Sequence, residues 1–176
     1  MRVIGGEFRS RILKSVPGLD TRPTPDRLRE ALFNVLATRI EGAVFADLYA
    51  GTGAVGIEAL SRGAARAIFL EKNRAALAVI RENLRTLGIE ARAEVRQGSS
   101  ARVIEGIHAD IVFLDPPYSM EREYASTLGA LGGNPPALVI AQHPPRLRLE
   151  EKYGALHCTR LLKQGDNVLS FYSGAG

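Results

Sequence analysis

The stretch that decides the fold is residues 45–56, which run Phe-Ala-Asp-Leu-Tyr-Ala-Gly-Thr-Gly-Ala-Val-Gly. An apolar strand ends in a glycine-rich loop, and the loop opens directly into a helix. Gly51, Gly53 and Gly56 have the spacing G-x-G-x-x-G, which lets a ligand approach the backbone and face the amides of the helix N-terminus. The segment therefore predicts the first strand–loop–helix unit of an α/β fold that binds a ligand at this loop.

Strands and helices alternate along the chain from residue 43 onwards. We expect strands at residues 43–48, 67–70, 93–97, 111–114 and 137–141, and helices at residues 53–62 and 73–87, the second ended by Gly88. This alternation indicates parallel strands with right-handed crossovers. Residues 157–162 and 168–172, joined by a turn-rich link, predict an antiparallel hairpin. The predicted fold class is α/β, a Rossmann-like and mostly parallel sheet with this hairpin at its C-terminal end.

Composition limits the class of protein. The chain has 176 residues, which suits one domain, and its single cysteine permits no internal disulfide. A lone cysteine is typical of a cytoplasmic protein, and we expect a cytoplasmic location. The three histidines have no cysteine or histidine at ligand spacing, so no metal site is expected. No apolar stretch approaches the length of a membrane span, so no membrane association is expected.

The net charge of +4 is concentrated at the N-terminus. Residues 1–39 contain eight of the 23 basic residues and four of the 19 acidic ones, so the remainder of the chain is balanced. Seven of these eight bases are arginines, whose forked guanidinium group suits phosphate contacts. A basic segment ahead of a neutral domain indicates nucleic-acid binding, although a solvated basic surface has the same composition.

The N-terminal segment itself is expected to form a small extension. Residues 2–4 and 11–13 predict two short strands, with Gly5 and Gly6 in the turn. Thr24 is expected to cap a helix whose first residue is Pro25. The arginines of this helix are expected to reach outward, away from its apolar face. Of these arginines, Arg27 and Arg29 lie off the apolar stripe. We therefore expect two parts, a basic hairpin and helix at residues 1–39 and an α/β domain at residues 40–173.

Two acidic residues help to identify the ligand of the glycine loop. Glu71 ends the second strand 20 residues after Gly51, where an acid binds ribose hydroxyls. Asp47 lies within the first strand, where it can bind an ammonium group but would repel a pyrophosphate. Glu71 suits the ribose of S-adenosylmethionine as well as that of a nicotinamide or flavin dinucleotide, and Asp47 favours S-adenosylmethionine. Ser99, after the third strand, is a candidate for contact with the adenine, and a helix N-cap is an equal alternative.

A second motif, Asp115-Pro116-Pro117-Tyr118, follows the apolar run at residues 111–114. Two prolines end the strand, so these residues are presented at the carboxyl edge of the sheet. Asp115 and the carbonyl of Pro116 can each accept an N–H from an exocyclic amine, directing its nitrogen at a methyl donor. Tyr118 can stack on an extruded base. The motif predicts amino-methyl transfer, with a strand-ending turn as the structural alternative.

The chain resembles the RsmD family, bacterial 16S ribosomal RNA guanine-N2 methyltransferases. The resemblance lies in residues 2–11, residues 22–30, the loop at residues 47–53 and Asp115–Tyr118, and it covers nearly the whole chain. It implies a seven-stranded methyltransferase fold, S-adenosylmethionine as cofactor and a guanine of 16S rRNA as target, in the small ribosomal subunit or an assembly intermediate. It also implies a monomer. The chain has Ser99 where the family often has an acid, and Gln142 where it often has Glu.

The resemblance also extends the set of expected site residues. It implies that Tyr49, Gly51, Thr52 and Gly53 contact the cofactor, and that Pro117 contacts the substrate. The basic N-terminal segment is implied to touch RNA, and the residues expected to do so are Arg9, Arg11, Arg22 and Arg27.

Three other functions are consistent with parts of the sequence. The Asp115 motif also serves amino-methyltransferases that act on adenine N6 of nucleic acid or on a protein glutamine. A non-catalytic RNA-binding protein would have no need of Asp47 or Asp115. A nicotinamide oxidoreductase is favoured only by the glycine spacing.

Overall fold

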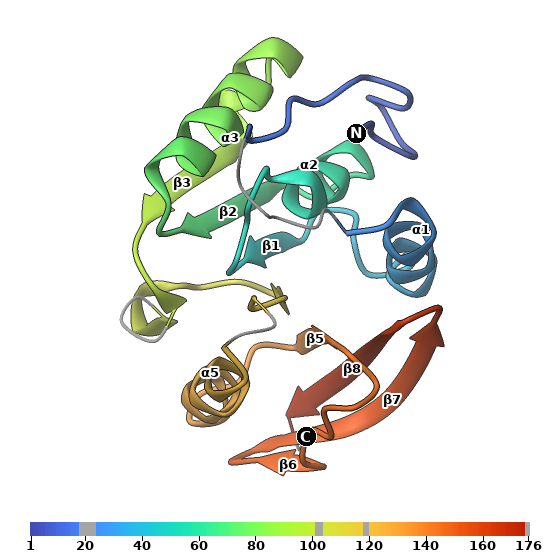
Figure 1. The fold of residues 1–176 in the computed structure, drawn as a ribbon, viewed down its shortest axis with the longest axis vertical. Coiled ribbons are helices and arrows are strands. Elements are labelled where there is room, and N and C mark those ends of the chain that lie inside the picture. The colour runs from blue at the N-terminus through green and yellow to red at the C-terminus, as the bar shows by residue number, and fades with distance from the viewer. Residues whose placement is uncertain (18–23, 101–103, 118–119, 175–176) are drawn as a thin grey trace.

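The computed structural model describes residues 1–17, 24–100, 104–117 and 120–174. Its centre is one sheet in the order β3-β2-β1-β4-β5-β8-β7-β6 (Figure 1). Arg22 and Tyr118, which the sequence analysis places in the site, lie outside the described residues.

Five parallel strands make up one side of the sheet. They are β1 Val44–Asp47, β2 Arg66–Glu71, β3 Ala93–Gln97, β4 Ile111–Leu114 and β5 Leu138–His143. The other strands are antiparallel: β6 Lys152–Tyr153, β7 Leu156–Gln164 and β8 Asn167–Gly174, with β8 pairing with β5. The predicted fold class and C-terminal hairpin are confirmed, and the two-residue strand β6 adds an eighth strand to the expected seven.

Helices cover both faces of the sheet. They are α1 Asp26–Val35, α2 Ala54–Ser61, α3 Arg74–Leu87 and α5 Arg122–Gly132, with short 3-10 helices at Glu90–Arg92 and Ile104–Gly106. Residues of α1, α2 and α3 share one buried apolar cluster with Phe45, Phe69 and Phe113. Residues of α5 share a second cluster on the opposite face with Ala46 and Val112. Figure 1 shows α3 alongside β2 and β3, and the twisted β7–β8 hairpin at the far end of the sheet.

Helix α5 is an element that the sequence analysis did not identify. Tyr124, Leu128 and Leu131 form its buried stripe. Gly129 and Gly132 lower its helix propensity, which weakens the sequence signal. Gly132 is required by packing, because a Cβ there would lie 2.1 Å from the carbonyl oxygen of Tyr153.

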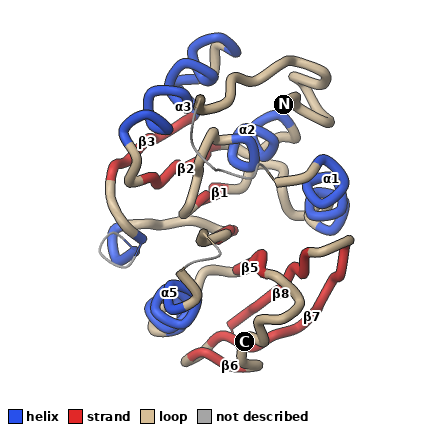
Figure 2. Tube along the Cα trace, viewed as in Figure 1, coloured by secondary structure: helices blue, strands red, loops and turns tan. Residues whose placement is uncertain are grey.

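The N-terminal segment forms a single antiparallel bridge, between Arg2 and Ile12, in place of the two expected strands. Figure 2 shows residues 1–17 as loop. The reason is that the amides of Ile4 and Gly5 donate to the two carboxylate oxygens of Glu58 on α2, each at 2.9 Å, and so do not form a ladder. The segment is thus anchored to the sheet's helical layer.

Two expectations about α1 are wrong. Its N-cap is Pro25, with no side-chain cap, so Thr24 precedes the helix and does not cap it. Arg29 does not reach outward and is fully buried. It donates to the carbonyl of Arg2 at 2.7 Å and to Asp26 at 3.0 Å, and lies 3.9 Å from Glu58. A buried guanidinium requires such partners, and the neighbouring α2 supplies the carboxylate.

Candidate active site

Strand register brings polar residues together at the carboxyl edge of the sheet. Asp47, the last residue of β1, pairs with Phe69 on β2 and with Phe113 on β4. Glu71 and Asp115 each lie two residues beyond those partners, so they lie further out on either side of Asp47. Side chains alternate between the faces of a strand, so all three belong to the face covered by α1–α3. Asp47 forms the floor of a site with an acid on each side.

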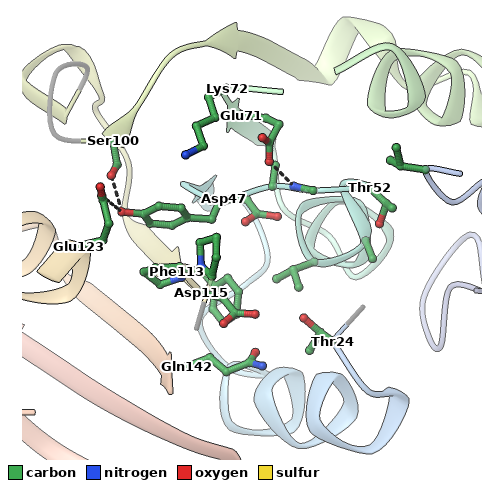
Figure 3. Close-up of a pocket in the computed structure, with 18 of the residues that line it drawn as sticks. Thr24, Asp47, Thr52, Glu71, Lys72, Ser100, Phe113, Asp115, Glu123 and Gln142 are labelled. Carbon is green, nitrogen blue, oxygen red and sulfur yellow. Dashed lines mark hydrogen bonds between the residues drawn. The ribbon is translucent and has the colours of Figure 1, made fainter. Parts of the chain in front are cut away.

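Gln142 extends this arrangement to the next strand. Leu114 on β4 pairs with Ala141 on β5, so Asp115 and Gln142 are level on neighbouring parallel strands. All four residues line one cavity of about 720 Å³, a volume typical of small-molecule sites. Figure 3 shows Asp47, Asp115 and Gln142 along its wall, with Glu71 near one end.

The glycine loop closes one side of this cavity. Gly53 is the N-cap of α2 and has φ 85°, a left-handed conformation that favours glycine. Gly56 is required by packing, since a Cβ there would lie 2.3 Å from Cε1 of Phe69. Gly51 and Thr52 line the cavity, whereas Gly53 is not among its lining residues. The G-x-G-x-x-G spacing thus combines loop positions that line the cavity with close packing of helix on strand.

Glu71 stabilises the entrance of the loop. Its Oε1 accepts the amide of Gly51 and its Oε2 accepts the amide of Asn73, both at 2.9 Å. A carboxylate has about four acceptor positions, so acceptor capacity remains for hydroxyl groups in the cavity. Asn73 in turn caps α3, accepting the amide of Ala76 at 3.0 Å.

Asp47 is buried and only half satisfied. Its Oδ2 accepts the amide of Gly56 at 3.2 Å, whereas its Oδ1 has no partner within the described part of the chain. Burial raises its pKa to about 7. The backbone amide of Gly56 and, more weakly, that of Tyr49 oppose the rise, and the nearby Glu71 adds to it. A buried carboxylate oxygen without a partner is costly, so the site is suited to a cationic donor.

Asp115 has a similar environment. Burial raises its pKa to about 7, and the charge of Asp47 contributes to the rise. Pro116 is buried and Pro117 is exposed, and both line the cavity. Asp115 can therefore present a carboxylate to a hydrogen-bond donor at the cavity wall.

The hydroxyl of Tyr49 forms a network that the sequence analysis missed. It donates to Glu123 at 2.8 Å and hydrogen-bonds with Ser100 at 2.6 Å (Figure 3). It also hydrogen-bonds with Thr127 at 2.9 Å. Burial is the main reason why its pKa rises to about 12. The network joins the loop after β1 to the loop after β3 and to α5. Ser99 lines the cavity, while its neighbour Ser100 is buried in this network.

The three predicted RNA-binding arginines that the structure describes lie outside the cavity. Arg9, Arg11 and Arg27 are exposed, and none of them is among the cavity-lining residues. Arg11 donates to the carbonyl oxygen of Thr86, at the end of α3, at 3.3 Å. Met1, Ser15 and Val16 do line the cavity, so the N-terminal segment forms part of its wall.

Two further observations concern the described residues alone. Within residues 1–17, 24–100, 104–117 and 120–174, no three His, Cys, Asp or Glu side chains are grouped so that they could hold a metal ion. In the same part of the chain, no helix combines the length and apolar character needed to cross a membrane.

The cavity fits S-adenosylmethionine on the evidence of its own residues. The unpartnered Oδ1 of Asp47 suits the ammonium of the methionine part, and the free acceptor positions of Glu71 suit ribose hydroxyls. The loop at Gly51 and Thr52 provides the close backbone approach between them. The same buried Asp47 would repel a pyrophosphate.

Solved structures have the same fold. The methyltransferase yhhF from Escherichia coli superposes with a TM-score of 0.83 at 35% identity, over 99% of this chain and 97% of that one. The sheet order, the glycine loop after β1 and the acids that end β1 and β2 and follow β4 are the features of a Rossmann-like methyltransferase.

Sequence relatives specify the family. A protein of Bacillus subtilis named as an rRNA methyltransferase, YlbH, is 34% identical over 188 residues, covering all of both chains. Ribosomal RNA small subunit methyltransferase D of E. coli is 44% identical over 119 residues, which span 67% of this chain and 60% of that protein. A family model described as "Conserved hypothetical protein 95" matches residues 1–173. The chain belongs to this family, the RsmD family of methyltransferases.

Proposed function

We propose that this methyltransferase transfers a methyl group from S-adenosylmethionine to the exocyclic N2 amine of a guanine in 16S rRNA. The row Glu71, Asp47 and Asp115 supports the chemistry, because it places cation-binding and amine-binding groups side by side in one cavity. The relatives support the substrate, since the E. coli protein is named as acting on small-subunit ribosomal RNA.

In this proposal, the residues on β1 and β2 hold the cofactor. Asp47 binds the ammonium, Glu71 binds the ribose hydroxyls, and the remaining contacts come from Tyr49, Gly51, Thr52 and Ser99. Gly53 shapes the loop as the N-cap of α2 and does not line the cavity. When bound, S-adenosylmethionine supplies an electrophilic methyl group on a sulfonium. The helix α2 behind the loop directs its free amides toward the same region.

Asp115 and Pro116 orient the acceptor. The N2 amine of guanine is a poor nucleophile because its lone pair is delocalised into the ring. The Asp115 carboxylate accepts one N–H and the Pro116 carbonyl accepts the other, which directs the nitrogen lone pair at the methyl carbon. As the N–C bond forms and the C–S bond breaks, the amine nitrogen gains positive charge. Its proton then leaves to Asp115, whose pKa of about 7 suits this role, or to water.

Tyr118 and Pro117 complete the acceptor side of this proposal. We assign Tyr118 to stacking on the extruded guanine and Pro117 to the edge of the same pocket. This role of Tyr118 rests on its place in the Asp-Pro-Pro-Tyr motif.

The N-terminal segment supplies the contact with RNA in this proposal. Residues 1–39 are the RNA-binding extension and residues 40–173 the methyltransferase domain, with Arg9, Arg11, Arg22 and Arg27 on phosphates. The substrate is the small ribosomal subunit or an assembly intermediate. The enzyme acts as a monomer in the cytoplasm and uses no metal.

The observation that carries the proposal is the position of Asp115 two residues beyond the partner of Asp47 on the adjacent strand. The experiment is methyl transfer from labelled S-adenosylmethionine to small subunits purified from cells that lack this enzyme. We expect Asp115→Ala to reduce transfer at least 100-fold, on the order expected for loss of a transition-state contact, while calorimetry shows cofactor affinity largely retained. Transfer at the wild-type rate would show that Asp115 does not have this role.

A further inference from the structure

The side-chain oxygen of Gln142 is buried without a hydrogen-bond partner among the described residues. The residue is only 4% exposed, and the unpartnered atom is its Oε1. An unsatisfied buried amide oxygen costs about 1–3 kcal/mol, so such groups in native proteins are rare. An oxygen of this kind that faces a cavity indicates a partner supplied by a ligand.

The backbone around Gln142 is firmly held. Its carbonyl accepts the hydroxyl of Tyr124 on α5 at 2.5 Å, and in the sheet it pairs with Leu169 on β8. The side chain lines the same cavity as Asp115, and Figure 3 shows it next to Asp115. The unpartnered amide oxygen of Gln142 is therefore held by a rigid part of the sheet, which suits a role in recognising a ligand.

Gln142 lies on the side of Asp115 that is away from the cofactor residues. The strand order β2-β1-β4-β5 puts Glu71, Asp47, Asp115 and Gln142 on four consecutive strands. With about 4.8 Å between strands, Gln142 is roughly 10 Å from the strand of Asp47 and roughly 14 Å from that of Glu71. It therefore faces the acceptor of the methyl group and is separated from its donor.

We propose that Gln142 is the residue that distinguishes guanine from other amine-bearing bases, an inference that rests on the proposed function. Once Asp115 holds the N2 amine, guanine presents an N1–H donor next to it and an O6 acceptor beyond. The Gln142 amide matches both, because Oε1 accepts from N1–H while Nε2 donates to O6.

Adenine does not satisfy the same pair. With its N6 amine at Asp115, adenine presents an acceptor at N1, which opposes the lone pairs of Oε1. Reversing the amide gives one hydrogen bond to N1 and leaves Oε1 facing a C–H group. Discrimination therefore comes from a lost hydrogen bond and a polar atom left unpaired.

The test uses small-subunit particles that carry either guanine or 2-aminopurine at the nucleotide that the wild-type enzyme modifies. 2-Aminopurine keeps the amine at position 2 and lacks both the N1–H and O6. For wild type, we expect kcat/KM for guanine to exceed that for 2-aminopurine by on the order of 10–100-fold, the value of a bidentate base contact. For Gln142→Leu, we expect the guanine value to fall until the ratio is close to one, with cofactor affinity unchanged.

Two further variants sharpen this experiment. Gln142→Glu keeps an acceptor for N1–H but cannot donate to O6, so it should recover part of the ratio that Gln142→Leu loses. Gln164→Leu, on β7 and not among the cavity-lining residues, is the matched control and should keep the wild-type ratio.

Two results overturn the inference, and they can be told apart. If wild type methylates guanine but Gln142→Leu retains its preference over 2-aminopurine, Gln142 is not the specificity residue and the proposed function stands. If wild type methylates no guanine in the particle, the proposed function fails and the inference fails with it.

Discussion

Asp47 and Asp115 face one cavity from the neighbouring parallel strands β1 and β4, and the charge of Asp47 helps to raise the pKa of Asp115 to about 7. Two buried carboxylates so placed destabilise each other when both are ionised. The arrangement is stabilised when a cation binds between or beside them. Their pairing is therefore the feature of the cavity that most directly indicates a cationic ligand.

Cofactor affinity should depend on pH mainly through Asp47, the carboxylate that we assign to the ammonium group of the cofactor. S-adenosylmethionine carries an ammonium and a sulfonium, so it favours ionised carboxylates and its binding releases protons. At pH values below the Asp47 pKa of about 7, cofactor affinity should fall by up to about tenfold per pH unit for each proton released. The affinity should level off above about pH 8. Calorimetry between pH 6 and pH 8 in buffers of different ionisation enthalpy measures both the cofactor affinity and the number of protons released on binding.

The variant Asp47→Asn separates the role of Asp47 in this pH dependence. It should lower cofactor affinity about 10–100-fold, as expected for loss of a charged hydrogen bond, and should flatten the pH profile. The exposed Glu90 on the 3-10 helix gives the control variant Glu90→Gln, which should change neither. A wild-type pH slope in Asp47→Asn would show that other groups are titrating.

Stability of the protein without cofactor should fall as pH rises. The folded pKa of Asp115 is about 7, above the ordinary value of 3.8, so the folded state resists ionisation that the unfolded chain accepts. Its stabilising protonation is fully present below the unfolded pKa and is lost between about pH 4 and pH 7. Asp115→Asn should therefore raise the melting temperature at pH 8 by about 2–6 °C, for about 1–2 kcal/mol. It should have little effect at pH 4.5, and an equal effect at both values would refute this explanation.

Tyr49→Phe should destabilise the protein without removing any apolar contact. It leaves Ser100, Glu123 and Thr127 without their shared partner, at a cost of about 1–3 kcal/mol in the free energy of unfolding. Tyr153→Phe is the control, because the Tyr153 hydroxyl accepts one exposed amide, that of Glu150. Denaturant unfolding measures both variants, and equal losses would mean that the Tyr49 network adds nothing.

Glu58→Gln should release the N-terminal segment. Glu58 accepts the amides of Ile4 and Gly5 and pairs with Arg62 at 2.8 Å, and it lies beside the buried Arg29. Removing its charge leaves Arg29 poorly compensated, which should cost about 3–5 kcal/mol. We expect faster proteolysis within residues 1–17. Glu30→Gln, at an exposed position of α1, should stay within about 0.5 kcal/mol of wild type.

Arg9→Ala tests the RNA-binding role of the N-terminal segment. It should raise the KM for the ribosomal particle, leave kcat nearly unchanged, and reduce the slope of log affinity against log salt by about 0.7–0.9. Arg148→Ala, another exposed arginine, is the control. Equal effects of the two variants would indicate general charge attraction with no specific role for Arg9.

Most of the sheet was predictable from the sequence. Strand residues such as Phe45, Phe69 and Phe113 lie in apolar runs of strand length, and Gly88 gives a clear helix end, confirmed by its left-handed conformation. The glycine loop was identifiable because its conformation and its packing both require glycine. Helix α5 was not found, because its glycines dilute the apolar stripe formed by Tyr124 and Leu128.

Polar residues whose partners lie far away in the sequence were harder to predict. The burial of Arg29 depends on Glu58, on a different helix, and single-sequence periodicity does not reveal that pairing. The network around Tyr49 was missed for the same reason, because it joins three segments that are far apart in the sequence. The resemblance already singled out Gln142, which stands where the family often has Glu and directly follows the predicted strand at residues 137–141. Its level position beside Asp115 required the register of β4 and β5.

The most direct test of the central claim is the identity of the methylated nucleoside. Small subunits from cells lacking this enzyme are incubated with it and with labelled S-adenosylmethionine, and their RNA is digested and analysed by mass spectrometry. We expect one labelled product, N2-methylguanosine, from 16S rRNA, absent with Asp115→Ala. Label in N6-methyladenosine or in protein glutamine, or no label with a control methyltransferase active in the same assay, would contradict the account.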